Sequence, residues 1–384
     1  MPASGATSRR ACVETLLTDL HSSPVRVVAW ERLEPWAVAR VTLRGIAAPR
    51  TAVVKWVRDQ PGSTRTEPWR LHTEVAALRH LSDDLGLAIA PRVLATDFSR
   101  GLVVLEDLAP RTALDRLLRR DGAAAHADRL AAFARARGEL SASTAGHAGR
   151  YLGQRTSLGP ADPAAAADMA QVAQLRNRAP GQAAALGVPL AGRVSHEFGA
   201  VLAELDDPGP FCALSNGDAE TNNVLVHEAG PADVRLIDFE SAAYTHALLD
   251  AVCLHVPGPA WMTVGDPVAT GLADHHRRTL ARGVPEAEDD RRYGTGLTAA
   301  CLFWAIARLQ RFGALDARVQ GDRSRLQLVE TLEAAARTAE HHRAHPHLAG
   351  WARRTADLLR RRWPDADLDF TDPVAFPPYT ARHP

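Results

Sequence analysis

The pattern of apolar and polar positions changes along the chain, from a strand-like texture to a helical one. The first hundred residues hold runs rich in β-branched residues, separated by turn residues, which predict strands over 25–33, 39–45, 51–57, 92–98 and 101–108. Between the third and fourth runs, Leu71, Val75, Leu78 and Leu81 follow helical spacing, which predicts a single helix over 67–84.

From about residue 112 onward the Ala-, Leu- and Arg-rich segments predict helices. A strand-like island interrupts them at 211–218, 222–228 and 233–240. Helices return from 246 to about 363, and the Pro-rich tail after them is expected to be irregular. The order therefore predicts a small strand-rich lobe ending near Glu106, then a large helical lobe with a small β insert.

Composition removes several functional classes. Lys+Arg and Asp+Glu both number 45, so the formal net charge is zero, which argues against nucleic-acid binding driven by bulk charge. The sequence contains no run of 18 apolar residues, so no membrane helix is predicted. The N-terminus also lacks the apolar segment of a signal peptide. Four scattered cysteines without a CxxC motif favour reduced thiols and a cytoplasmic protein.

Two rare residue types point to special chemistry. Lys55 is the only lysine among the 45 basic residues, and it lies inside the apolar run TAVVKWV. Asparagine occurs four times, and three of the four are Asn216, Asn222 and Asn223. Chance in an arginine-rich sequence is the plain alternative for both.

A pair between Lys55 and Glu74 is the first candidate constellation. Alternation in a strand places Lys55 on the same face as Val53 and Val57, and Glu74 falls within the apolar stripe of the predicted helix. A buried carboxylate needs a cation or hydrogen bonds. We therefore predict that Lys55 pairs with Glu74, the alternative being a solvated Glu74 at the edge of the stripe.

The second constellation lies in LSNGDAETNNVLV and VRLIDFE. Asp218 and Asn223 lie on the turn after one strand, and Asp238 comes 15 residues after Asn223, at the end of the next strand. Two carboxylates and an amide are hard oxygen ligands that suit Mg²⁺, and a remaining carboxylate can take the proton of a hydroxyl. Ordinary turn chemistry is the alternative, but Asp238 is predicted inside an apolar strand, where turn preferences do not apply.

Five segments, in order from about 30 to 255, resemble the aminoglycoside phosphotransferase-like small-molecule kinases, which include relatives of choline and homoserine kinases. They are VVKWV, TEVAALRHL, VVLEDL, SNGDAETNNVLV…LIDFE and HALLDAV. The resemblance implies a protein-kinase-like α+β fold with an N-terminal nucleotide-binding lobe over 1–107, built on a small antiparallel sheet. A helical C-terminal lobe with the catalytic and acceptor-binding site would span 108–384.

Site roles follow from this resemblance. Lys55, held by Glu74, would contact the ATP α- and β-phosphates, and Val53 would pack on the adenine ring. The backbone of Glu106 and Leu108 would hydrogen-bond adenine. Asp218 would be the catalytic aspartate, with Asn223 and Asp238 as Mg²⁺ ligands. Asp250 would be a buried brace for the catalytic loop, within an apolar helix.

Two departures from the family pattern concern the catalytic and nucleotide loops. Asn216 stands where the family usually has histidine before Gly-Asp, a mainly structural position. The loop over 33–41 has no glycine, so none of its residues is assigned to the site.

Other polar clusters are given structural interpretations. The histidines of HHRAHPH are predicted to mark a helix end, with a metal site as the alternative. The acidic run 286–290 is predicted to be a solvated helix start or loop, the alternative being a site for a cationic substrate. Asp115 is predicted to be an ordinary acid early in a helix.

Together these features predict an enzyme that transfers the ATP γ-phosphoryl group to a hydroxyl of a small molecule. Antibiotics, amino alcohols and sugar-like metabolites all fit as acceptors. A non-catalytic nucleotide-binding regulator with this fold is one alternative, and nucleotidyl transfer at the same site is another.

Overall fold

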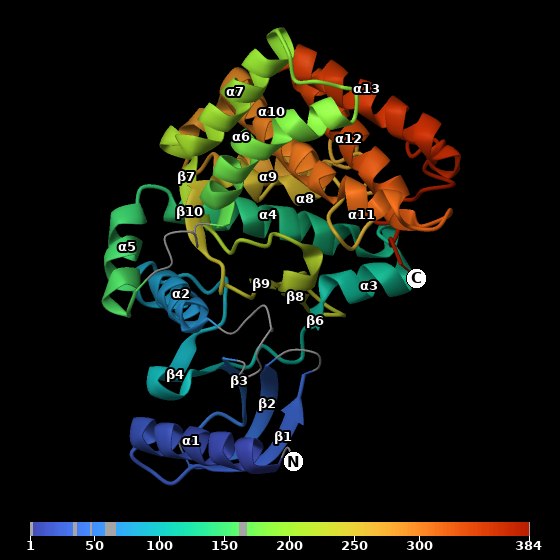
Figure 1. The fold of residues 1–384 in the computed structure, drawn as a ribbon. Helices are drawn as coiled ribbons and strands as arrows, with labels where there is room; N and C mark the ends of the chain where they lie inside the picture. The colour runs from blue at the N-terminus through green and yellow to red at the C-terminus, as the bar shows by residue number, and fades with distance from the viewer. Residues whose placement is uncertain (1–2, 34–36, 47, 58–66, 161–166, 384) are drawn as a thin grey trace. The chain divides into compact units, whose positions relative to one another are not determined.

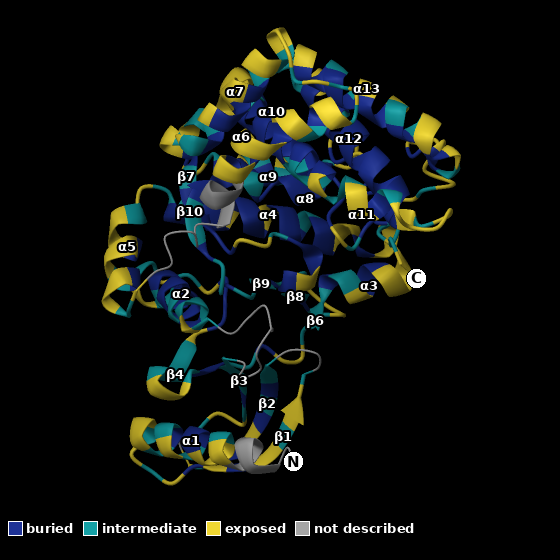
Figure 2. Cartoon of the chain, in the orientation of Figure 1, coloured by how far each residue is buried: buried dark blue, intermediate teal, exposed yellow. Residues whose placement is uncertain are grey.

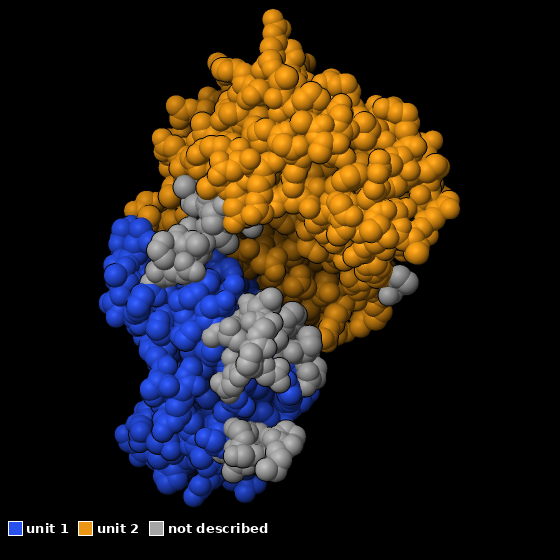
Figure 3. Space-filling model, in the orientation of Figure 1, with its two compact units in different colours: residues 1–111, 149–162, 235–242 blue, residues 112–148, 163–234, 243–384 orange. Residues whose placement is uncertain are grey.

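A computed structural model describes the chain except for residues 1–2, 34–36, 47, 58–66, 161–166 and 384. The chain forms two compact units (Figure 3). The first comprises residues 1–111, 149–162 and 235–242, and the second comprises residues 112–148, 163–234 and 243–384. The predicted division at 107/108 stays a prediction.

A five-stranded antiparallel sheet forms the first unit, in the order β1-β2-β3-β5-β4. The five predicted strands are confirmed as β1 (Arg26–Arg32), β2 (Val38–Arg44), β3 (Thr51–Trp56), β4 (Val93–Asp97) and β5 (Leu102–Glu106). Of the 33–41 loop, residues 34–36 lie outside the described part of the chain.

A helix that the apolar pattern did not indicate covers one face of this sheet. Helix α1 (Ala3–His21) buries Cys12, Val13 and Leu17 (Figure 2). They pack with sheet residues such as Val54 and Val104 in one core. The prediction of a single helix in the first hundred residues was therefore wrong. So few apolar positions give a weak periodic signal, and tertiary packing supplies most of a helix's stability.

The predicted helix over 67–84 is confirmed as α2 (Pro68–Arg79), which continues into the π-helical turn η1 (His80–Asp84). Pro68 occupies the first turn, where its missing N–H costs no intrahelical bond. Helix α5 (Ala148–Ser157) packs beside α2 within the same unit. Its buried Arg155 donates hydrogen bonds to Thr73 Oγ1 and to the Trp69 carbonyl of α2.

Helices dominate the second unit, as predicted (Figure 1). They are α3 (Leu114–Asp121), α4 (Ala127–Thr144), α6 (Ala167–Ala185), α7 (Arg193–Asp206), α8 (Val252–His255), α9 (Leu272–Leu280), α10 (Asp290–Arg308), α11 (Phe312–Asp316), α12 (Arg323–His342) and α13 (Pro346–Arg362). Helix α10 is the centre of the core, with Leu297, Cys301 and Phe303 almost fully buried. Helices α4 and α9 approach closely at Gly138, where a Cβ atom would lie 2.5 Å from the His276 carbonyl oxygen.

Short strands carry the loops of interest. The predicted island is confirmed as β7 (Cys212–Ser215), β8 (Val224–Val226) and β9 (Val234–Leu236). Two strands were not predicted: β6 (Thr112–Ala113), which pairs with β8, and β10 (Ala243–His246), which pairs with β7. Both are short and depend on a partner strand, so a local pattern does not reveal them.

The structure bears on two further predictions, the state of the cysteines and the absence of a membrane helix. All four cysteines are free, and Cys12, Cys253 and Cys301 are buried. Among the described residues, no helix combines the length and the apolar character needed to cross a bilayer.

Candidate functional site

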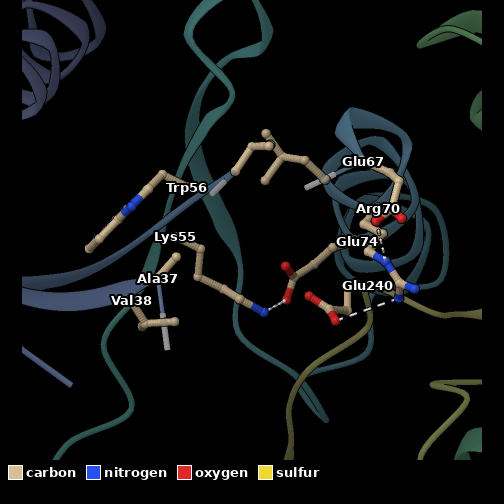
Figure 4. Close-up of a pocket in the computed structure, with 10 residues that line it drawn as sticks. Ala37, Val38, Lys55, Trp56, Glu67, Arg70, Glu74 and Glu240 are labelled. Carbon is tan, nitrogen blue, oxygen red and sulfur yellow. Dashed lines mark hydrogen bonds and ion pairs between the residues drawn. The ribbon is translucent and has the colours of Figure 1, made fainter. Parts of the chain in front are cut away.

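Lys55 is the centre of the site in the first unit. Along β3, Ala52 and Val54 point into the core under α1, so Val53 and Lys55 lie on the opposite face. Lys55 Nζ donates hydrogen bonds to Glu74 Oε1 at 2.6 Å and to Asp238 Oδ1 at 2.8 Å (Figure 4 draws the first). The predicted Lys55–Glu74 ion pair is thus present, and the structure adds Asp238 to it.

The electrostatic balance keeps Lys55 charged. Burial alone would lower the pKa of Lys55, but the charges of Asp238 and Glu74 outweigh it, and the pKa rises well above its usual range. For Glu74, burial raises the pKa, and the attraction of Lys55 opposes that rise. The lysine is therefore a permanent cation fixed between two carboxylates.

Asp238 has an unusual backbone. Strand β9 ends at Leu236, so Asp238 lies beyond the strand and not within it, which corrects the sequence-based placement. Its φ of 64° is in the left-handed region, where non-glycine residues are uncommon and Asp and Asn are enriched. This conformation turns the chain sharply just where the carboxylate reaches Lys55.

A pocket of about 450 Å³ adjoins Lys55, and Figure 4 shows the side chains that converge on it. Arg70 of α2 lies between two acids: its guanidinium is 3.2 Å from Glu67 Oε2 and 3.7 Å from Glu240 Oε1. It also donates to the Ser241 hydroxyl at 3.0 Å. These contacts tie α2 to the segment that carries Asp238.

The residues assigned to adenine binding lie on β3 and at the end of β5. Val53 is half-buried and pairs in register with Leu105. The Glu106 N–H donates to the Arg92 carbonyl, and the Leu108 carbonyl accepts from the Arg111 N–H. A contact with adenine would therefore use other backbone groups of these two residues. The adjacent Asp107 is fixed by a two-point ion pair with Arg40.

In the second unit, β7 delivers the loop that holds Asp218. Asn216 is fully buried and accepts a hydrogen bond from Arg137 at 2.8 Å, which gives this residue a structural role. Gly217 follows with a φ of 78°, a conformation that favours glycine. Asp218 comes next and is exposed on the loop.

Asn223 lies in the same loop, and its side-chain amide is oriented by the backbone. Its Nδ2 donates to the Asp218 carbonyl at 3.1 Å, and its Oδ1 accepts from Asn222 Nδ2 at 3.0 Å. Amide and carboxylate oxygens are donors that Mg²⁺ accepts, so Asn223 and Asp238 fit the proposed ligand set by their chemistry. Because they belong to different units, their convergence stays a prediction, as does that of Asp218 with Lys55.

A second pocket, of about 620 Å³ with its open mouth, is lined by Asp218, Glu220, Phe303 and Trp304 among others. The sequence analysis missed Glu220, which lies in a polar loop without periodicity. Its carboxyl group packs so tightly on Gly258 that a Cβ at that glycine would come within 1.7 Å of Oε1. Burial, together with the charge of Asp218, raises the pKa of Glu220 to about 7.

Asp250 is buried beneath this loop. It accepts a hydrogen bond from the Ser215 hydroxyl at 2.5 Å and lies 3.5 Å from Arg137 Nη1. It occupies a turn after η7 (Ala247–Leu249), not a helix as predicted. Asp250 is buried as expected, and its role as a brace for a catalytic loop stays a prediction.

The remaining polar clusters have structural roles. Helix α12 ends at His342, which confirms the predicted helix end. No group of three or more His, Cys, Asp or Glu in the described chain has a metal-binding arrangement. Asp289 caps α10 by accepting from the N–H groups of Arg291 and Arg292, and Asp115 lies in the first turn of α3.

Comparison with solved structures finds small-molecule kinases. The choline kinase LicA from Streptococcus pneumoniae is 12% identical, with a TM-score of 0.43 over 86% of this chain and 99% of its own. An ethanolamine kinase from Plasmodium vivax is 9% identical, with a TM-score of 0.44 over 87% of this chain and 83% of its own. An aminoglycoside-3'-phosphotransferase of type VIII is 21% identical, with a TM-score of 0.33 over 70% of this chain and 91% of its own.

Neither protein-family models nor curated protein sequences give a match to this chain.

Proposed function

We propose that this protein is an ATP-dependent phosphotransferase that moves the γ-phosphoryl group to a hydroxyl of a small molecule. The observation that carries the proposal is the fixed ammonium group of Lys55, held by Glu74 and Asp238 over 2.6 and 2.8 Å. In protein kinases, a strand lysine paired with a helix glutamate contacts the ATP phosphates, and a nearby loop aspartate holds Mg²⁺. Lys55, Glu74 and Asp238 match these three positions.

The residues divide the work of phosphoryl transfer. Lys55 neutralises charge on the nucleotide phosphates, while Val53 and the backbone around Glu106 and Leu108 hold adenine. The acceptor hydroxyl oxygen attacks the γ-phosphorus, and its proton passes to the Asp218 carboxylate. The bond from the γ-phosphorus to the bridging oxygen breaks, which gives ADP and a phosphate ester.

Asp238 and Asn223 are the proposed ligands of Mg²⁺. Bound magnesium would neutralise charge on the β- and γ-phosphates. The contact of Asp238 Oδ1 with Lys55 Nζ at 2.8 Å fixes the orientation of the carboxyl group that would hold the metal.

A coupled assay of ADP formation tests the proposal. Purified protein, ATP and Mg²⁺ are incubated with a panel of hydroxylated amines, sugars, hydroxy acids and antibiotics, and products are identified by mass spectrometry. A phosphate ester with ADP supports the proposal. Pyrophosphate with a nucleotide adduct would favour nucleotidyl transfer, and ATP binding without turnover of any acceptor would favour the non-catalytic regulator.

A further inference from the structure

Three arginines beside the pocket of Asp218 form no ion pair within 4 Å among the described residues, although Glu220 and Asp218 act on Arg308 from a longer distance. Arg308 is the last residue of α10, and its guanidinium carbon lies 4.4 Å from the ring centroid of Trp304, which lines that pocket. Arg311 follows one turn later, in η9 (Leu309–Arg311). Arg382 lies in the C-terminal tail, and its backbone N–H donates to the Ala260 carbonyl at 2.9 Å.

The three side chains are close enough to act on one another electrostatically. Burial, followed by the charge of Arg311, lowers the pKa of Arg308 to about 10, and Arg382 contributes to the same shift. Burial and Arg311 likewise lower the pKa of Arg382. A lowered arginine pKa means that the surroundings oppose the positive charge, since arginine otherwise stays protonated in proteins.

Hydrogen-bond donors in this cluster are left unused. Within the described chain, Arg308 Nη2 and Arg382 Nε are buried and have no hydrogen-bond partner. The neighbouring arginines Arg318 and Arg119 have carboxylate partners, Asp322 at 3.1 Å and Asp115 at 3.9 Å. Buried donors on charged groups are costly when unpaired, so the cluster has the properties of a site that awaits an anion.

A chain of contacts connects Arg382 to the Asp218 pocket. Arg382 Nη1 donates to Gln327 Oε1 at 3.2 Å, and Gln327 Nε2 donates to the Gly258 carbonyl at 2.7 Å. Gly258 packs on the carboxyl group of Glu220 in the pocket wall. On the other side, Trp304 connects Arg308 to the same pocket.

We propose that Arg308 and Arg311, together with Arg382, bind an anionic group of the acceptor, a carboxylate or a phosphate. The identification of the ligand as the acceptor rests on the proposed phosphotransferase function. Guanidinium groups match the planar geometry of these anions through paired hydrogen bonds. The acceptor would then carry its hydroxyl near Asp218 and its negative charge near Arg308. A counter-charge for Glu220 is the rival role for Arg308, and it predicts no preference for anions.

A series of three-carbon compounds on one skeleton tests this. Binding of glycerol, glycerate, glycerol 3-phosphate and 3-amino-1,2-propanediol to the full chain is measured by calorimetry in the presence of ADP. At least one anion should bind about 10-fold more tightly than glycerol and the amine, since charged hydrogen bonds are the stronger ones. Preference for glycerate assigns a carboxylate, and preference for glycerol 3-phosphate assigns a phosphate.

Variants connect the preference to the cluster. Arg311→Gln is the main test, because the side chain of Arg311 has no hydrogen bond or ion pair within the described chain. Arg308→Gln is the second. Each should weaken binding of the preferred anion about 10-fold, and Arg361→Gln, an exposed arginine on α13, should not. Circular dichroism and thermal unfolding verify that each variant is folded.

The outcomes separate this inference from the proposed function. Four results would each overturn the inference. They are equal binding of all four compounds, preference for the amine, no measurable binding of either anion, and an anion preference that is unchanged in both variants. Formation of ADP with the amine alone would overturn the anion site but would support the proposed phosphotransferase function. Arginine-dependent anion binding without transfer to any acceptor would support the anion site and overturn the enzyme function.

Discussion

The guanidinium of Arg155 donates a hydrogen bond to Thr73 Oγ1 over 2.9 Å, and Thr73 immediately precedes Glu74. The same guanidinium donates to the carbonyl oxygens of Trp69, Gly159 and Pro160. Helix α5 therefore fixes α2 at the helical turn that contains Glu74, the residue whose carboxylate contacts Lys55.

Replacing Arg155 with leucine should lower the free energy of unfolding by about 2–4 kcal/mol, because the buried Thr73 hydroxyl and three carbonyl groups lose a charged donor. Arg150→Leu on the same helix is the control. The Arg150 side chain is 56% exposed, and Asp84 keeps its hydrogen bonds with His80 and Gln154, so the change should stay below about 1 kcal/mol. Urea unfolding followed by circular dichroism measures both, and equal effects would contradict the role given to Arg155.

Lys55→Arg should reduce kcat/KM for phosphoryl transfer by about 100-fold or more, although the charge is retained. A planar guanidinium cannot take the place of a compact ammonium between Glu74 and Asp238, and preorganised charges of this kind contribute strongly to the rate. Arg79→Lys, on α2, serves as the control. Near-normal kcat/KM in Lys55→Arg would remove this residue from the mechanism.

Asp238→Asn and Asp238→Ala should both abolish magnesium-dependent activity, because each removes the carboxylate proposed as a metal ligand. They should differ in stability. Asparagine tolerates the left-handed backbone at φ 64°, whereas alanine should cost about 1–2 kcal/mol there. Thermal unfolding of the two variants measures this difference, and a magnesium titration of activity in either variant that matches wild type would refute the ligand assignment.

Asp218→Asn should reduce kcat by about 10²–10⁴-fold, the usual contribution of general acid–base catalysis. ATP affinity should change little, because in the proposed mechanism Lys55, the β5 end and the metal would hold the nucleotide. The exposed position predicts an unchanged thermal midpoint. Calorimetry of ATP binding decides the division of roles: joint loss of binding and turnover would make Asp218 a nucleotide or metal ligand.

Glu220 should make stability depend on pH. Its pKa in the folded protein is about 7, raised from 4.5, so between these values the folded state binds more protons than the unfolded chain. Stability from this carboxyl is fully present below pH 4.5 and is lost as pH rises through about 7. The loss should be on the order of 3 kcal/mol. Urea unfolding at pH 5 and pH 8 measures the free energy of unfolding. It should decrease less between these pH values in Glu220→Gln than in wild type, and an equal decrease in both proteins would exclude the effect.

Local sequence patterns predicted the elements whose signal is local. The five strands of the first sheet and α2 follow from short apolar runs and a helical stripe, and the pairing of Lys55 with Glu74 follows from the cost of burying a carboxylate. Helix α1 was missed because Cys12, Val13 and Leu17 are stabilised mainly by sheet residues far along the chain.

The parts of the site that depend on distant contacts could not be predicted from patterns. Nothing in the sequence around Arg155 indicates that it binds Thr73, and nothing around Arg308 indicates proximity to Arg382. The left-handed backbone of Asp238 is a third case, since an apolar run favours an extended strand there. Each arises from tertiary structure that brings separated segments together.

The composition of the first unit has a consequence for how this protein is made. Residues 235–242 belong to that unit, so the environment of Lys55 is incomplete until Asp238 has been synthesised. Domains generally fold in order as they leave the ribosome, but here the nascent N-terminal segment must wait for more than half of the chain. A fragment that ends at residue 111 would therefore keep Lys55 and Glu74 but lack Asp238. Restoring the full environment of Lys55 would require residues 235–242 to be supplied on a separate chain.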